Sequence, residues 1–423
     1  MLRPGKIARA AGTGASVPVE CCQVCGHAPL DAVLSLGYMP PVNQMVPIGH
    51  VPRQQPWFPT NLLHCRNCDL AQLGLAVDPA IIFPPEYPYT SGTTKLLRNN
   101  FADLQRESAA LLGLTGQDLV VDIGSNDGTL LSNFKNGGHR VLGIEPTDVG
   151  DIANSRGIPT LKCYFGVEVA RDVVNEHGPA SVVTAANCFA HMEDVHAIVD
   201  GIKAMLKEDG VFISESHYLI PLLDTLQYDT VYHEHLRYYS LASLKYLLEM
   251  HDLEVFHARP IPSHGGSIRV YATRRGSHAV NDSVGEMLEA EPRGEAMSKR
   301  LAAFRRDVVL SKLRLLSMLR DLKEKGARVA GISAPSRAST LVNYVGLDEG
   351  LIDYVCEIAG SLKIGKCMPG TAIPVVDEAT LFEDQPDCAI IFSWHIADEL
   401  APKLRAKGFR GQLITPLPAP RLL

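Results

Sequence analysis

The chain has 423 residues, which is more than one typical domain holds, so two or three domains are expected. Its apolar content of 46% and charged content of 21% are those of a soluble globular protein. The net charge of −7 argues against a nucleic-acid groove, and no stretch approaches the ~20 apolar residues of a membrane helix. Residues 1–17 carry Arg3, Lys6 and Arg9 but no apolar segment, which indicates a flexible tail and not a signal peptide. We therefore expect a cytoplasmic protein without a nucleic-acid or membrane partner.

Half of the ten cysteines are scattered singly along the chain, as buried thiols usually are. Four of the others form two Cys-x-x-Cys pairs, Cys22 with Cys25 and Cys65 with Cys68. Two such pairs supply the four thiolates of a closed, structural zinc site, with Cys21 as an alternative to Cys22. Disulfides or chance spacing are weaker interpretations in a chain of this length.

A proline-rich stretch follows the second cysteine pair and carries Tyr87 and Tyr89. The prolines at positions 84, 85 and 88 exclude a helix, so we expect an ordered loop or linker. A helix is expected over residues 95–112.

The chain is organised around the segment that follows the apolar run 119–123. Gly124 allows a tight turn after this strand, and the residues up to Gly128 precede an apolar run typical of a helix. Backbone N–H groups and the positive end of the helix then face a ligand. A second strand, 141–145, ends in Glu145, whose carboxylate can hold both hydroxyls of a ribose.

Strands and helices alternate from residue 119 to residue 273, which predicts a parallel, doubly wound sheet. The expected strands are 119–123, 141–145, 181–186, 210–215, 254–257 and 268–273. Ligands bind at the carboxyl ends of such strands, so Gly124, Glu145, Asn187 and Glu215 should share one rim, with His191 just beyond it.

Titratable and aromatic residues are concentrated after Glu215, above all in Tyr232-His233-Glu234-His235. Tyr232 and His235 are three residues apart and should face the same way. This density favours catalysis over a solvated surface. A metal site is a weaker interpretation, because no third ligand can be placed. His264 and Ser267 bracket a pair of glycines, which indicates either a bulge or a close backbone approach to a ligand.

A long amphipathic helix, residues 297–325, leads to a third unit. This unit opens with another strand, small-residue loop and helix from residue 328, and strands at 352–357, 388–392 and 411–415 complete a second, small α/β sheet. Its loop, with Arg337 and Lys363 nearby, is expected either to hold a pyrophosphate or to be a tight turn.

The pattern Asp-x-Gly-x-x-x-Gly with a following acid resembles the S-adenosylmethionine site of class I methyltransferases. The residues that would contact this cofactor are Asp122, Gly124, Ser125, Asn126, Asp127, Gly128, Glu145 and Asn187. Nearly the whole chain after residue 20 is similar to the sugar C-methyltransferase family. The similarity rests on both cysteine pairs, the glycine loop, Tyr-His-Glu-His, His264-Gly-Gly-Ser267 and Leu341-Val-Asn-Tyr344.

The resemblance implies four segments: a tail (1–17), a zinc-binding domain (18–92), a class I methyltransferase domain (93–295) and a Rossmann-like domain that helps to bind a nucleotide sugar (296–423). It implies methylation of a carbon of a nucleotide diphosphate-linked keto-deoxysugar. The family's active-site positions correspond to Tyr87, His191, Tyr232, Glu234 and His235. The expected substrate-binding residues are Tyr89, His233, His264, Ser267, Arg337, Asn343 and Lys363.

The expected mechanism begins with proton removal from a carbon beside the sugar ketone, followed by methylation of the enolate. Spacing alone does not decide among His191, His233 and His235, but the resemblance and the face shared with Tyr232 favour His235 as the base. The third unit departs from the family, because Ser333, Arg337 and Ala338 stand where glycine, lysine and glycine are typical. The nucleotide or its binding is therefore expected to differ. Two alternatives are a zinc-ribbon methyltransferase acting on RNA or another substrate, and a non-catalytic, zinc-stapled binding protein. The sequence leaves the oligomeric state open.

Overall fold

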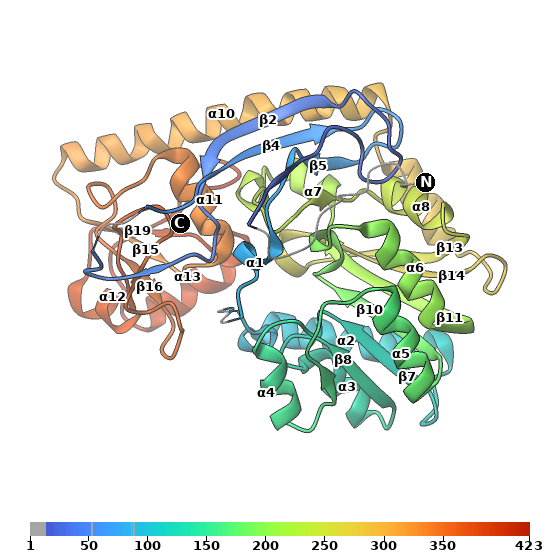
Figure 1. Cartoon of the computed structure of the whole chain (residues 1–423). Helices are drawn as coiled ribbons and strands as arrows, with labels where there is room; N and C mark the ends of the chain where they lie inside the picture. The colour runs from blue at the N-terminus through green and yellow to red at the C-terminus, as the bar shows by residue number, and fades with distance from the viewer. Residues whose placement is uncertain (1–13, 52–53, 86, 88) are drawn as a thin grey trace.

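The computed structural model describes residues 14–51, 54–85, 87 and 89–423 (Figure 1). Most of the predicted flexible tail (residues 1–13) and Pro88 of the predicted loop lie outside the described residues. Strand β1 (Val17–Pro18) already pairs with β6 (Leu75–Ala76), so the end of the predicted tail belongs to the fold. Within the described ranges, no helix has the length and apolarity needed to cross a membrane.

The central sheet has seven strands in the order β13-β14-β11-β10-β7-β8-β9. Its strands are β7 (Leu119–Ile123), β8 (Arg140–Ile144), β9 (Thr160–Leu161), β10 (Ala180–Ala186), β11 (Leu206–His217), β13 (Leu253–Ile261) and β14 (Ser267–Arg274). Strands β7 to β11 are parallel, whereas β14 runs antiparallel to both of its neighbours, β11 and β13. The predicted doubly wound sheet is confirmed, and it acquires an antiparallel strand near one edge.

Helices pack around this sheet, and α3, α4, α5 and α6 separate its parallel strands. They are α2 (Lys95–Leu112), α3 (Thr129–Asn136), α4 (Val149–Ser155), α5 (Val167–His177), α6 (Val195–Met205), α8 (Leu241–Glu249) and α9 (Asp282–Ala290). Helix α2 has the predicted bounds for identifiable reasons. Thr94 caps its first turn by accepting a hydrogen bond from the Leu97 N–H at 3.4 Å, and Gly113 ends it in the left-handed region with φ +61°.

The N-terminal unit is completed by a strand from the middle of the chain. Its sheet has the order β12-β5-β4-β2, formed by β2 (Asp31–Met39), β4 (Phe58–His64), β5 (Ala71–Leu73) and β12 (Arg237–Tyr238). Strand β12 directly follows the Tyr232–His235 turn and pairs with β5. The pairing therefore fixes this turn against the N-terminal unit.

The C-terminal unit contains a six-stranded sheet in the order β18-β16-β15-β19-β20-β21, parallel except for β21. Its strands are β15 (Val329–Ile332), β16 (Val355–Glu357), β18 (Val375–Asp377), β19 (Cys388–Ile391), β20 (Gln412–Thr415) and β21 (Arg421–Leu422), with helices α11 (Ser336–Val345), α12 (Ala379–Asp384) and α13 (Ala397–Ala406). The predicted small α/β sheet is confirmed. Strand β17 (Lys366–Cys367) leaves the unit to pair with β3 (Val46–Pro47).

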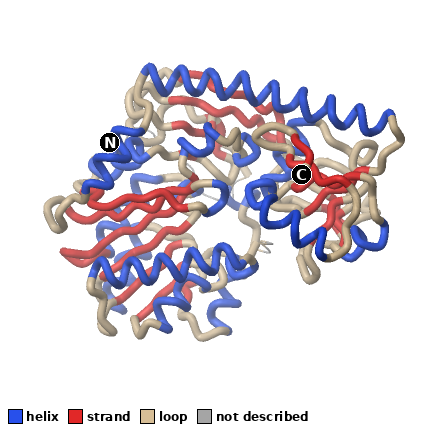
Figure 2. The backbone as a smooth tube through the Cα atoms, turned by 180° about the vertical axis from the view of Figure 1, so that it is seen from behind, coloured by secondary structure: helices blue, strands red, loops and turns tan. Residues whose placement is uncertain are grey.

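Helix α10 (Glu295–Glu324) joins the parts and runs along one side of the molecule, over β2 and β4, to the C-terminal unit (Figures 1 and 2). The predicted apolar stripe of this helix is buried against β2, α7 (Leu219–Asp224) and α11. The predicted domain boundaries at 92/93 and 295/296 stay predictions, because β12 and β17 exchange between the units. These strand pairings connect the three units around one region, in which the candidate site lies.

Candidate active site

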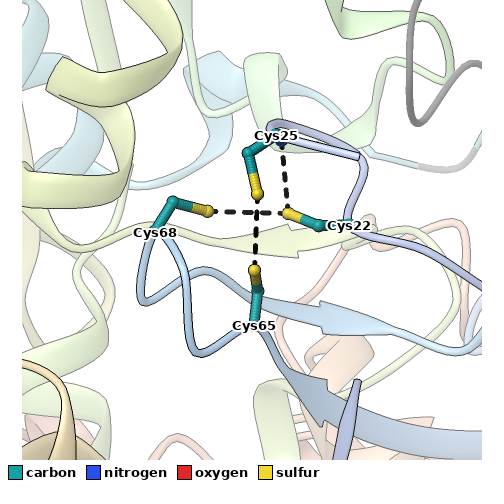
Figure 3. Close-up of side chains that lie close together, drawn as sticks. All are labelled: Cys22, Cys25, Cys65 and Cys68. Carbon is teal, nitrogen blue, oxygen red and sulfur yellow. Dashed lines mark hydrogen bonds between the residues drawn. The ribbon is translucent and has the colours of Figure 1, made fainter. Parts of the chain in front are cut away.

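The four predicted zinc ligands converge in the N-terminal unit, with their sulfur atoms pointing toward one another (Figure 3). Sγ of Cys22 lies 3.5 Å from Sγ of Cys68, and Sγ of Cys25 lies 3.5 Å from Sγ of Cys65. Each Cys-x-x-Cys turn closes because a residue after its second cysteine, Gly26 or Asp69, adopts positive φ and donates its N–H to the first cysteine's carbonyl.

The donor set fits zinc. A tetrahedral site with Zn–S bonds of about 2.3 Å places its sulfur atoms about 3.8 Å apart, and all four Sγ atoms here lie within 4.8 Å of one another. Four thiolates leave no coordination position for water or substrate, so the zinc is structural. Cys21 is not part of this group. The chain uses Cys22, which removes the alternative that the sequence leaves open.

The glycine loop, residues 124–128, follows β7 and leads into α3. Gly124 has φ +68°, and a Cβ atom added there would lie 2.8 Å from Cβ and 2.9 Å from Sγ of Cys188. Asn126 and Gly128 also have positive φ, +52° and +74°. The loop therefore depends on glycine at position 124 for both its conformation and its space.

Three predicted cofactor residues accept hydrogen bonds from other groups of the protein. Glu145 accepts hydrogen bonds from the Asn126 N–H at 3.0 Å and the Thr147 N–H at 2.9 Å, which ties the second strand to the glycine loop. Asp127 accepts from the N–H of Thr129, the first residue of α3, at 3.2 Å. Asp122 accepts from the Thr184 hydroxyl at 2.6 Å, and burial raises its pKa to about 7.

Two other residues of the rim keep buried polar atoms without a protein partner, namely the Ser125 hydroxyl and both atoms of the Asn187 side-chain amide. Asn187 directly follows β10 and has φ +61°, an uncommon conformation for a residue other than glycine. Buried polar groups are nearly always satisfied, so these atoms fit a polar ligand such as an adenosine or amino acid moiety. They fit the cofactor that the glycine loop predicts.

Replacing Gly124 by alanine is expected to weaken binding of S-adenosylhomocysteine about tenfold or more. The left-handed conformation costs alanine roughly 1–2 kcal/mol, and its methyl group would displace Cys188. Calorimetric titration measures the effect. The matched control is Gly285→Ala in α9, where an added Cβ meets no atom within 4 Å. Equal affinities for the two variants would place the cofactor elsewhere.

The Tyr232–His235 segment is a tight turn closed by the hydrogen bond from the His235 N–H to the Tyr232 carbonyl at 2.9 Å. The two rings face each other with centroids 4.1 Å apart, as their spacing predicts. His191 also stacks on His235, at 5.0 Å between centroids. Nδ1 of His235 lies 2.8 Å from the Thr230 carbonyl and donates to it, so Nε2 is the nitrogen able to accept a proton.

Glu234 is held by two residues from the N-terminal part of the chain. It accepts hydrogen bonds from the Tyr87 hydroxyl at 2.9 Å and from the Asn43 amide at 2.7 Å. Ser336 of the C-terminal unit donates in turn to Asn43 at 3.0 Å. Residues of all three units thus meet at this carboxylate.

Burial dominates the protonation of the site. It lowers the pKa of His235 to about 4, with a further lowering by the charges of His264 and Arg337. It lowers the pKa of His191 well below its usual value. Burial raises the pKa of Glu234 to about 7, although the hydrogen bonds from Tyr87 and Asn43 oppose this shift. The imidazole of His235 is therefore neutral at neutral pH, the form a base requires.

The seven predicted substrate residues lie in several different places. His264 borders the histidine rings, 5.6 Å from His217, and Lys363 donates to the Ala334 carbonyl at 2.6 Å. Tyr89 lies at the cofactor loop, where its carbonyl accepts from the Asn126 amide at 3.2 Å. His233 instead points into the N-terminal sheet, with Nε2 3.0 Å from the Thr60 hydroxyl.

The remaining three predicted substrate residues, Arg337, Asn343 and Ser267, also form hydrogen bonds to protein groups. Arg337 donates to both carboxylate oxygens of Asp229, each at 2.7 Å, and its guanidinium lies over the Trp394 ring. Asn343 donates to the Pro369 carbonyl at 3.0 Å. Ser267 donates to the Ser263 carbonyl at 3.0 Å. The Arg337 contact joins the C-terminal unit to the methyltransferase unit. Substrate contact by all three residues stays a prediction.

Two residues at the site carry no local signal strong enough to be singled out from the sequence. Asn43 lies in the long segment between the cysteine pairs, 191 positions from Glu234. His217 ends β11, and its ring lies 4.9 Å from His235 and 5.6 Å from His264. Its place two residues after Glu215, at the carboxyl end of a parallel strand, is the signal that could have found it.

The order of the seven central strands, with β14 antiparallel, and the glycine loop at the carboxyl end of the first strand define a class I S-adenosylmethionine-dependent methyltransferase. Three family models match the chain in turn: a zinc binding domain at residues 22–83, a methyltransferase domain at 96–258 and a C-methyltransferase C-terminal domain at 262–418. Together they cover all three units.

The chain is 34% identical over 412 residues to C-methyltransferase NovU of Streptomyces niveus. The aligned region covers 96% of this chain and 97% of that protein. The chain therefore belongs to the C-methyltransferase family and is an S-adenosylmethionine-dependent C-methyltransferase with a structural zinc. This membership favours the enzyme over both the RNA-directed and the non-catalytic alternatives.

Solved structures resemble only part of the molecule. An S-adenosylmethionine-dependent methyltransferase from Clostridium acetobutylicum is 13% identical, covers 44% of this chain and 94% of its own, and has a TM-score of 0.33. Magnesium protoporphyrin IX methyltransferase from Synechocystis, solved with bound S-adenosylmethionine, is 14% identical, covers 43% and 82%, and has a TM-score of 0.32. Similarities this low carry no functional argument.

Proposed function

We propose that this C-methyltransferase methylates a carbon of a nucleotide diphosphate-linked keto-deoxysugar, within deoxysugar or branched-sugar biosynthesis, and that His235 is the base. The observation that carries the proposal is the group of Tyr232, His235 and His191 beside the Tyr87–Glu234 pair, placed just beyond the cofactor rim. Such a group suits an acidic C–H bond better than an oxygen or nitrogen nucleophile, which needs less activation.

When bound, S-adenosylmethionine supplies an electrophilic methyl group, so the chain's own residues must make the carbon nucleophilic. A C–H bond beside a ketone ionises when a base and an enolate stabiliser are both positioned. His235 is suited to remove the proton through Nε2, because its Nδ1 is engaged by the Thr230 carbonyl. We assign the Tyr232 hydroxyl and His191 to donating hydrogen bonds to the enolate oxygen, since both rings adjoin that of His235.

The diphosphate needs a cation, and Lys363 is the better placed of the two predicted ones. Its ammonium donates to the Ala334 carbonyl at 2.6 Å and retains further N–H donors for an anion. Arg337 is engaged by Asp229 and by the His264 carbonyl at 3.2 Å. We therefore assign Arg337 to holding the C-terminal unit against the site.

Mass spectrometry of small molecules released from freshly purified protein tests the substrate class. The proposal predicts S-adenosylhomocysteine together with a nucleoside diphosphate or its sugar conjugate. Recovery of S-adenosylhomocysteine with an unrelated small-molecule acceptor, and no methylation of any added keto-deoxysugar nucleotide, would contradict it.

Replacing Tyr87 by phenylalanine is expected to move the acid limb of the pH–rate profile to higher pH. The Tyr87 hydroxyl donates to Glu234 and favours its charged form, so removing it raises the pKa of Glu234 further above about 7. A hydrogen bond to a charged group is worth roughly 1.5–3 kcal/mol, so a shift of about one unit is expected. Rate profiles of kcat/KM measure it.

The matched control is Tyr246→Phe on α8, whose hydroxyl accepts from Asn67 far from Glu234. It should leave the profile unchanged. An unmoved acid limb in Tyr87→Phe would show that the ionisation of Glu234 does not set that limb.

A further inference from the structure

Four histidine rings form a continuous row through the site, although the proposed function uses only two of them. The distances between successive centroids are 5.0 Å from His191 to His235, 4.9 Å from His235 to His217 and 5.6 Å from His217 to His264. The rings come from four separate elements: two 3₁₀ helices, the Tyr232–His235 turn and the end of β11. His217 is the ring that connects the base to His264.

The proposed reaction leaves a proton on a buried histidine, and the row of rings provides a route for removing it. Each C-methylation releases one proton, and the base receives it in a buried position, since His235 is 5% exposed. The Thr230 carbonyl on Nδ1 cannot take up a proton. The proton must therefore return to carbon or leave His235 through a neighbouring group.

His217 and His264 continue the row on from the buried base. Both are partly exposed, and His264 follows the exposed Pro262. Imidazoles whose centroids are about 5 Å apart can exchange a proton through one water molecule that bridges their nitrogen atoms. The row thus joins the buried ring of His235 to rings that are partly exposed.

The His264 ring is held where the row needs it. His264 has φ +56°, a strained conformation for a residue other than glycine. Arg337 donates to its carbonyl at 3.2 Å, and the Gln227 amide donates to the next carbonyl, of Gly265, at 2.7 Å. Strain that is fixed by neighbours in this way is typical of functional positions.

The charged and titratable groups around His217 keep its imidazole neutral between transfers. Burial is the largest cause that lowers its pKa, followed by the charges of His235, His264, Arg337 and His191. Tyr232 faces His235 from its own turn. Because the pKa values of all these rings are lowered, no ring traps the proton.

We propose that His217 is a positioning residue that accepts the proton from His235 and passes it to His264 and on to water. The inference rests on the proposed role of His235 as the base. The C–H bond breaks, its electron pair forms the enolate, and the proton moves to Nε2 of His235. It then moves to His217 and to His264, while the enolate carbon takes the methyl group and the sulfonium sulfur keeps the pair of the broken S–C bond.

The variants that test the relay are His217→Gln and His264→Gln, which keep polar side chains but cannot shuttle protons. The matched control is His177→Gln at the end of α5, outside the row. The probes are thymidine and uridine diphosphate 4-keto-6-deoxy sugars, of which the parent enzyme selects the working one. Thermal unfolding midpoints close to that of the parent show that the variants fold.

Two rates are compared: deuterium uptake from heavy water at the carbon beside the ketone, with S-adenosylhomocysteine bound, and methylation in a single turnover. For His217→Gln and His264→Gln we expect deuterium uptake to fall about tenfold or more, since the proton returns to carbon. Single-turnover methylation by His217→Gln should stay within about threefold of that of the parent. Added imidazole should restore the uptake in His217→Gln.

Unchanged deuterium uptake in His217→Gln would overturn the relay and leave the proposed function standing. A parallel loss of uptake and first-turnover methylation, without rescue by imidazole, would show that His217 only supports the structure. Full activity of His235→Gln, or no turnover of any probe by the parent, would instead contradict the proposed function and remove the relay with it.

Discussion

Replacing His235 by glutamine is expected to reduce both deuterium exchange at the substrate carbon and methylation by roughly 10²–10⁴-fold, the range for loss of a general base. The reason lies in the geometry of this one imidazole. Its Nδ1 is engaged by Thr230, its ring faces Tyr232, and burial keeps it neutral at neutral pH. Glutamine preserves polarity and much of the volume but cannot accept the proton.

The control for this variant is His233→Gln, one of the three histidines among which spacing does not decide. Its imidazole bonds to Thr60 in the N-terminal sheet, so the substitution should cost stability more than catalysis. Exchange and first-turnover methylation in folded His233→Gln should remain near those of the parent. If the effects of the two variants were reversed, the base would have to be reassigned to His233.

The double substitution Cys65→Ser/Cys68→Ser is expected to remove the zinc and to unfold the N-terminal unit. Structural zinc contributes about 10–16 kcal/mol of apparent binding free energy in small zinc modules, and that energy stabilises the fold. The damage should reach the active site. Asn43 holds Glu234, and β5 pairs with the β12 strand that follows His235. Methylation should therefore be lost together with the metal.

Metal analysis and thermal unfolding measure this effect. The parent should carry one zinc per chain, and the double variant less than half an equivalent with a lower unfolding midpoint. Cys21→Ser is the matched control, since this cysteine is next to a ligand but outside the group of four. Zinc retained by the double variant, or lost in the control, would contradict the ligand assignment.

Much of the fold is readable from local patterns. The helix over residues 95–112 has a threonine cap and a terminal glycine, and the predicted and observed bounds coincide. The strand bounds of the central sheet are less well predicted: β11 begins at Leu206, four residues before the expected start, and β13 extends to Ile261. Burial and strand pairing, which are not local, decide such ends.

The exchange of strands between units could not be predicted from the sequence. Strand β12 has only two residues, Arg237 and Tyr238, and β17 likewise has two, Lys366 and Cys367. Runs this short show no periodicity, and each forms only because a distant edge strand is available to pair with it. These exchanges nevertheless bring the three units together at Glu234.

The candidate site was predictable where its residues adjoin in sequence and not where they meet through the fold. Tyr232 and His235 share a turn, and the four zinc ligands come in two spaced pairs, so their grouping follows from spacing. The partner of Arg337 could not be predicted from spacing. Its charge suggests a phosphate ligand, but the fold places Asp229 against it. The contact of Asn43 with Glu234 is likewise visible only in three dimensions.

The central claim is that a carbon beside a sugar ketone receives the methyl group. Incubation of the enzyme with S-adenosylmethionine carrying a ¹³C-labelled methyl group and the panel of keto-deoxysugar nucleotides tests it directly by NMR. The account predicts a product whose labelled methyl carbon couples to a ring carbon and resonates in the C–CH₃ region, with loss of one ring proton next to the ketone. A labelled methyl group attached to oxygen or nitrogen, with that ring proton retained, would contradict it.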